Sequence, residues 1–245
     1  MLAALRTPEE LAHYSLASRM GGVVNLVAVQ PLNLAWMPLL FRLREDQRPE
    51  VLRILVPYLV IGFGAIVIAI SAGVGPLLSW MGSEPSYARG VPLVPWIAFG
   101  YAAFGLVVIT TGVLALYQRT AAVSLWIVLA ALANLAMNFV LVPFHGAMGS
   151  AVASLLAYAG LAVVHFRLVR NLIPVRYPWG RIAGVAIASA AAAFVASFRP
   201  YTGSAADWGL RAGAVAAWAA ALYVTRWFTP AEAREIVRVL RQRST

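Results

Sequence analysis

Six polar side chains interrupt apolar stretches that are otherwise long enough to cross a membrane. Polar groups at that depth are costly to bury, so they usually face a protein interior or an aqueous cavity. A guanidinium attracts an anion, and a carboxamide both donates and accepts hydrogen bonds. The six candidate ligand-binding residues are Arg19, Asn25, Gln30, Asn33, Asn134 and Asn138.

Two interpretations are open for Arg19, which lies five residues beyond Tyr14, about 7 to 8 Å along a helix axis. Its side chain can snorkel to the membrane interface, or it can present a fixed cation to an anionic substrate. A similar choice applies to the segment from Gln30 to Asn33. Pro31 predicts a kink there, which either lines a cavity with freed carbonyls or only shapes the packing.

Asn134 and Asn138 are four residues apart, so their amides project from one face of the predicted helix. Contact with a substrate explains this spacing. Hydrogen bonding between helices explains it equally well.

The composition excludes several chemistries. The chain has no cysteine, which rules out disulfides and thiolate metal sites. It has no lysine, which rules out a retinal Schiff base and other covalent chemistry of that amine. The three histidines are scattered and lack spaced carboxylate partners, so they do not indicate a metal site. We expect no cofactor.

Seven apolar stretches must position the six candidates. The chain is 62% hydrophobic and 11% charged, and its mean hydropathy is +0.80. A span of roughly 20 apolar residues crosses the hydrocarbon layer. The sequence therefore predicts an all-α polytopic membrane helix bundle with about seven transmembrane helices. The predicted spans are residues 14–41, 54–78, 92–117, 121–142, 147–169, 182–198 and 209–228.

Arginines fall almost entirely on every second loop between these stretches. Of the 19 basic residues, 14 follow the first, third, fifth or seventh stretch, 4 lie in the alternate loops, and Arg19 lies inside a stretch. By the positive-inside rule, the amino terminus is expected outside and the carboxyl terminus in the cytoplasm. The net charge of +10 then reflects membrane topology, and we expect no nucleic-acid partner. The four arginines expected in outer loops are Arg6, Arg89, Arg199 and Arg211.

The loops are too short to hold a catalytic domain, the longest being residues 79–91. Whatever the chain does is then done within the membrane, which favours transport over enzymatic activity. Residues 229–245 are expected to form a basic cytoplasmic tail helix. That helix either lies on the anionic inner leaflet or is solvated.

Two stretches resemble bacterial polysaccharide flippases. Residues 14–19 and 30–41 read YSLASR and QPLNLAWMPLLF, similar to the pattern YSLAxR, then P, then AWxPxxF. Residues 134–143 and 146–151 read NLAMNFVLVP and GAMGSA, similar to NxxxN, (I/V)P and GxxGxA. The chain thus resembles the Wzx-type oligosaccharide flippases of the MATE-like MOP exporter superfamily, from about Leu11 to Arg176.

This resemblance implies the carboxyl-terminal lobe of such a flippase over residues 1–176, two additional transmembrane helices over 177–228, and the tail over 229–245. Such flippases usually have twelve or fourteen spans in two lobes around a cavity, so an amino-terminal half or a second copy is an expected partner. The implied activity is the flipping of a lipid-linked oligosaccharide, a polyprenyl pyrophosphate, across the bacterial cytoplasmic membrane for lipopolysaccharide or exopolysaccharide synthesis. Arg19 would pair with the anion, and the five amides would contact sugar hydroxyls.

Two alternatives remain open at this point. One is an integral-membrane enzyme of envelope polysaccharide synthesis, namely a polymerase, ligase or acyltransferase. Such an enzyme needs an acid or base at a loop edge, where Glu84 and His145 are among the few candidates. The other is a truncated fragment that inserts into the membrane without transporting.

Overall fold

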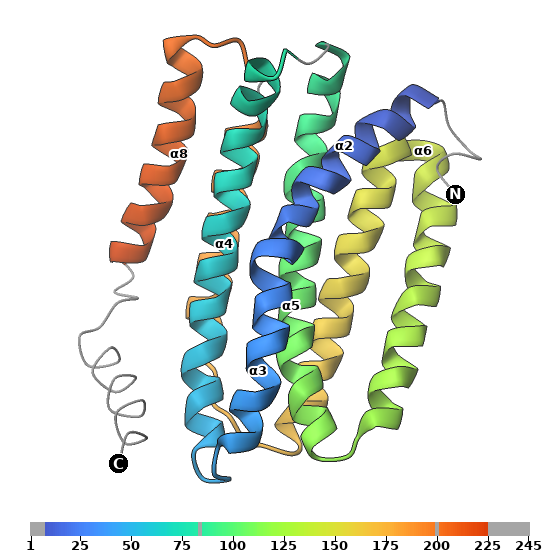
Figure 1. Ribbon diagram of the computed structural model, residues 1–245, viewed down its shortest axis with the longest axis vertical. Helices are drawn as coiled ribbons and strands as arrows, with labels where there is room; N and C mark the ends of the chain where they lie inside the picture. The colour runs from blue at the N-terminus through green and yellow to red at the C-terminus, as the bar shows by residue number, and fades with distance from the viewer. Residues whose placement is uncertain (1–7, 83–84, 199–200, 225–245) are drawn as a thin grey trace.

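The computed structural model describes residues 8–82, 85–198 and 201–224, and all regular structure within these ranges is helical (Figure 1). The predicted tail helix lies outside the described residues. The helical elements are α2 (Pro8–Val24), the π-helix η1 (Asn25–Val29), α3 (Gln30–Arg42), α4 (Arg48–Trp80), the 3-10 helix η2 (Pro85–Leu93), α5 (Val94–Leu116), α6 (Thr120–Arg170), α7 (Trp179–Phe198) and α8 (Ala205–Val224).

Five helical segments in the described ranges are long and apolar enough to cross a membrane, as expected for a membrane protein. They are Glu10–Arg42, Arg48–Trp80, Ala88–Leu116, Thr120–Arg170 and Trp179–Phe198.

Helix α6 replaces the loop that we expected between residues 142 and 147. Its 51 residues are helical except at Gly146, where φ is 55° and ψ is −133°. Only glycine adopts this conformation readily, because it has no Cβ. The chain reverses there, and the two arms of α6 lie side by side (Figure 1). A one-residue reversal leaves fewer backbone groups without partners than a longer loop would.

The connections that carry arginines share one end of the bundle. The α3–α4, α5–α6 and α6–α7 connections all lie at the lower end in Figure 1. The η2 segment, the reversal at Gly146 and the α7–α8 connection lie at the opposite end. This is the geometry that arginines on alternate loops predict.

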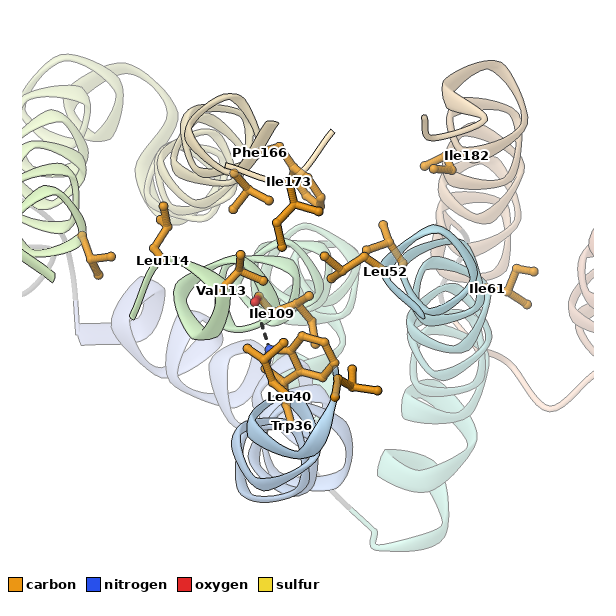
Figure 2. Close-up of a cluster of buried hydrophobic side chains, with 14 of the residues drawn as sticks. Trp36, Leu40, Leu52, Ile61, Ile109, Val113, Leu114, Phe166, Ile173 and Ile182 are labelled. Atoms are coloured by element: carbon orange, nitrogen blue, oxygen red, sulfur yellow. Dashed lines mark hydrogen bonds between the residues drawn. The ribbon is translucent and has the colours of Figure 1, made fainter. Parts of the chain in front are cut away.

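Trp36 fixes α3 against α5 in the largest core cluster (Figure 2). Its side chain is 1% exposed, and its indole Nε1 donates a hydrogen bond to the Ile109 carbonyl oxygen at 2.9 Å. Gly112 makes room for the ring, because a Cβ there would lie 2.8 Å from Trp36 Cδ1. The tryptophan of the flippase-like AWMP sequence therefore has a packing role in this chain.

Helices α7 and α8 are held to α4 by close packing of small residues. A Cβ on Gly64 of α4 would overlap the Ser189 side chain of α7. The Ser189 hydroxyl in turn accepts a hydrogen bond from Trp218 Nε1 of α8 at 2.8 Å. Three helices thus meet at one buried hydroxyl.

The expectation that Arg211 lies in an outer loop is wrong. Helix α8 begins at Ala205, four residues before the predicted start at 209. Ser204 caps this start, since its Oγ accepts a hydrogen bond from the Asp207 N–H at 3.3 Å. The Asp207 carboxylate accepts two more from the Thr202 N–H and hydroxyl, each at 2.7 Å. Arg211 lies in the second turn of α8, where its side chain is 3% exposed.

Arg211 repairs a gap in the hydrogen bonding of α4. Pro76 has no N–H, so the Ala72 carbonyl four residues earlier loses its helical partner. Arg211 Nε donates to that Ala72 oxygen at 3.1 Å. The guanidinium also lies 5.1 Å from the centre of the Tyr201 ring, within cation–π range. A buried cation thus joins α8 to α4.

This pairing predicts that substitutions of Arg211 and Pro76 have non-additive effects on the free energy of unfolding. Arg211→Met leaves the Ala72 carbonyl without a partner and should lower the free energy of unfolding by about 1–3 kcal/mol. In a Pro76→Ala background the helix supplies its own N–H, so Arg211→Met should cost clearly less. The unchanged chain, the two single variants and the double variant would be compared by unfolding with SDS in mixed micelles, as a double-mutant cycle. An equal cost in both backgrounds would contradict this role of Arg211.

Candidate ligand-binding residues

The first span carries four of the six candidates and contains a π-helix. In η1 the Gln30 N–H donates to the Asn25 carbonyl oxygen, one residue farther back than in an α-helix. The cause is Pro31, which has no N–H for the Val27 carbonyl. The kink predicted at Pro31 is therefore present as a widened turn just before it.

The exposed face of α3 and η1 presents amides among apolar side chains. Gln30 and Asn33 are exposed, and within the described ranges neither amide has a recorded hydrogen-bond partner. Leu26 and Leu34 on the same segment are 71% and 77% exposed. Asn25 is half-buried beside them. This face offers hydrogen bonds that the described part of the chain does not use.

Arg19 lies toward the arginine-poor end of the bundle. Its exposed side chain borders an open hollow of about 380 Å³ between α2 and the end of α4. Ser15 supplies a hydroxyl to the lining, and Leu78 and Met81 form its α4 side. No ion pair of Arg19 is recorded among the described residues. Its cation is placed to attract an anion, and it also lies near enough to the end of the bundle to snorkel.

Asn134 and Asn138 engage each other and the second arm of α6. Asn138 Nδ2 donates to the backbone oxygen and to Oδ1 of Asn134, at 2.9 and 3.1 Å. Asn134 Nδ2 donates to Ser154 Oγ on the other arm at 3.4 Å. Asn138 is 9% exposed. These contacts favour the interpretation of hydrogen bonding between helices, and no recorded contact in the described ranges joins this pair to the four candidates of the first span.

Sequence reasoning missed a buried polar contact between α5 and α6. His165, expected at a membrane interface, is fully buried. Its Nδ1 lies 3.4 Å from Thr110 Oγ1 and 3.5 Å from Thr111 Oγ1. The adjacent threonines in an otherwise apolar stretch were the available signal for this contact.

The first turns of α2 precede the predicted span, which begins at residue 14. Because α2 begins at Pro8, both Glu10 and His13 are helical. The Glu10 carboxylate lies against Gly146, where a Cβ would be 2.9 Å from Oε2. His13 is buried with its carbonyl against Gly90 of η2. The first turns of α2 therefore pack against both the reversal of α6 and η2.

If the two asparagines act structurally, Asn138→Leu should lower the free energy of unfolding by about 0.6–2 kcal/mol, since it removes the donor of two hydrogen bonds. Phe139→Leu is the matched control, because Phe139 is 62% exposed on the same arm. Unfolding in mixed micelles would measure both. Unchanged stability of the Asn138 variant, together with loss of transport at normal expression, would instead indicate contact with a substrate.

Comparison of the chain with protein-family models, with curated proteins and with solved structures gave no match.

Proposed function

We propose that this chain is the carboxyl-terminal half of a flippase that moves a lipid-linked oligosaccharide across the bacterial cytoplasmic membrane. The observation that carries the proposal is the exposed face of the first span. Gln30 and Asn33 are exposed there without recorded partners in the described ranges, in a helix broken by η1. Broken helices at membrane depth commonly border the binding sites of transporters.

The proposed fold is a MOP-like lobe of five spans, with the arms of α6 as the fourth and fifth, followed by two added spans, α7 and α8. Figure 1 supports this division, because α8 lies at one edge of the bundle and the first arm of α6 at the other. The exposed faces of α2 and α3 lie between these edges. A second lobe, either an amino-terminal half or a second copy of the chain, would face them across a cavity.

In the proposed mechanism the cavity opens alternately to each side of the membrane. The pyrophosphate and sugars must leave water, while the polyprenyl tail stays in lipid throughout. Arg19 would hold the pyrophosphate by charge, and the amides of Asn25, Gln30 and Asn33 would replace water at the sugar hydroxyls. Such contacts lower the cost of moving polar groups through the membrane.

The proposed orientation has the arginine-rich end in the cytoplasm and the amino terminus outside. The chain acts as a transporter and not as an enzyme in this proposal. Substitution of His145, an exposed side chain next to the reversal of α6, should therefore be tolerated.

A complementation assay tests the proposal. A flippase-null strain would receive the chain alone or a version extended upstream in frame, and surface polysaccharide would be measured. We expect rescue by the extended version. In it, Gln30→Ala with Asn33→Ala should lower the rate of surface display roughly thirtyfold, at about 1 kcal/mol for each of two lost hydrogen bonds.

The matched control is Leu26→Ala with Leu34→Ala, which truncates exposed apolar side chains on the same segment. Immunoblots would equalise the amounts of protein. Failure of both versions to rescue, or an equal loss in the control pair, would refute the proposed function.

A further inference from the structure

The hollow of about 380 Å³ beside Arg19 has a polar and an apolar side. Ser15 and Arg19 of α2 are four residues apart, so the hydroxyl and the guanidinium lie on one helix face. Leu16 and Met20 form a second lining pair with the same spacing. Both polar side chains are exposed, and both apolar side chains are half-buried. The α2 side of the hollow thus presents a cation and a hydroxyl next to an apolar wall.

Helix α4 completes the apolar wall and indicates the depth of the hollow in the membrane. Leu78 and Met81 line the hollow, at the last turn of α4 and directly after it. Trp80, the last residue of α4, is 85% exposed. An exposed tryptophan at the end of an apolar span is typical of the level where hydrocarbon meets the head groups. The Arg19 side chain reaches toward this level, because side chains tilt toward the amino terminus of their helix.

Two other candidates of the first span lie at a different depth. Gln30 and Asn33 follow Arg19 by 11 and 14 residues, or roughly 16 and 21 Å of helical rise. The hydrocarbon layer is only about 30 Å thick. Figure 1 shows α2 running obliquely from the arginine-poor end and α3 continuing toward the arginine-rich end. The cation therefore lies near one surface of the membrane, and the two amides lie deeper.

A prenyl diphosphate matches both sides of the hollow. The Arg19 guanidinium can donate two parallel hydrogen bonds to phosphate oxygens, and the Ser15 hydroxyl can donate another. The flexible side chains of Met20 and Met81 can adapt to a branched isoprenoid chain. The volume of about 380 Å³ is near the lower end of the range for small-ligand sites, roughly 300–1,000 Å³. It suits a diphosphate with the first isoprenoid units and not an oligosaccharide.

We propose that this hollow binds the diphosphate and the first isoprenoid units of the lipid carrier after its head group has crossed the membrane. The inference rests on the proposed transport and gives its steps an order. The isoprenoid tail lies in the same leaflet as the diphosphate to which it is joined. A diphosphate at Arg19 therefore belongs to a molecule whose tail has reached the leaflet at the arginine-poor end. Gln30 and Asn33 contact the glycan during passage, and Arg19 holds the diphosphate at its end.

Binding of geranylgeranyl pyrophosphate to the purified full chain tests this site, because the recorded lining of the hollow belongs entirely to this chain. The chain in a neutral detergent would be titrated by calorimetry with this compound, with geranylgeraniol or with inorganic pyrophosphate. We expect geranylgeranyl pyrophosphate to bind at least tenfold more tightly than either. Equal binding of pyrophosphate would show an anion site that needs no lipid. Equal binding of geranylgeraniol would show an apolar groove that needs no anion, and either result would overturn the proposal.

Arg19→Gln should weaken the binding of geranylgeranyl pyrophosphate at least tenfold, and Arg19→Lys should weaken it less because the charge remains. The control is Arg167→Gln, which removes the same charge from an exposed residue in the last turn of α6 and should leave binding unchanged. An equal loss in Arg167→Gln would indicate a general charge effect. Unchanged binding in Arg19→Gln would show that Arg19 only snorkels to the interface. Both results would overturn the proposed site.

Rescue of the flippase-null strain separates this inference from the proposed function. Rescue by the extended chain, with no binding of geranylgeranyl pyrophosphate to the purified chain, would overturn the site and leave the transport proposal standing. Binding that depends on Arg19, with no rescue by either version, would refute the proposed function and the order of its steps, though not the binding site.

Discussion

A backbone carbonyl that loses its helical partner inside a bilayer has no water to bond, so the protein must supply a replacement. This constraint applies at three breaks in the described helices. At Pro31 the chain widens into a π-helix, and at Pro76 Arg211 reaches from α8 to the freed Ala72 oxygen. At Gly146 a single residue reverses α6 and returns it to helix at once. The Arg211 contact joins α8 to α4, and the reversal at Gly146 brings the second arm of α6 beside the first.

Close packing between helices stabilises the bundle in addition to these replacement hydrogen bonds. Water-driven hydrophobic burial is weak between helices in lipid, so association depends on small residues and on hydrogen bonds between helices. Gly112 admits the Trp36 ring, and Ser189 joins three helices through one hydroxyl. The outer face of the first span takes no part in this packing. It retains the polar groups of Gln30 and Asn33, and that is why we place the cavity there.

Hydropathy and alternating arginines predicted the helical class and the approximate limits of the long helices, because crossing a bilayer imposes a length and a composition. They did not predict where the helices touch. Arg211 was expected in an outer loop and His165 at the membrane interface, because burial of a polar group depends on partners distant in the sequence, here Ala72 and Thr110. The Asn134–Asn138 spacing fitted both a ligand site and an internal contact, and only the opposing Ser154 favours the contact. The turn at Gly146 was expected as a loop, since a positive φ cannot be read from composition alone.

We propose that the exposed face of the first span adjoins water within the membrane, and cysteine accessibility tests this most directly. The chain has no cysteine, so single cysteines can be introduced without background. Gln30→Cys and Asn33→Cys, made in the upstream-extended chain in cell membranes, should react with a membrane-impermeant maleimide. Leu132→Cys and Leu135→Cys, at exposed positions on the first arm of α6, should not react because they face lipid. Reaction at Gln30 and Asn33 no faster than at these controls would contradict the account.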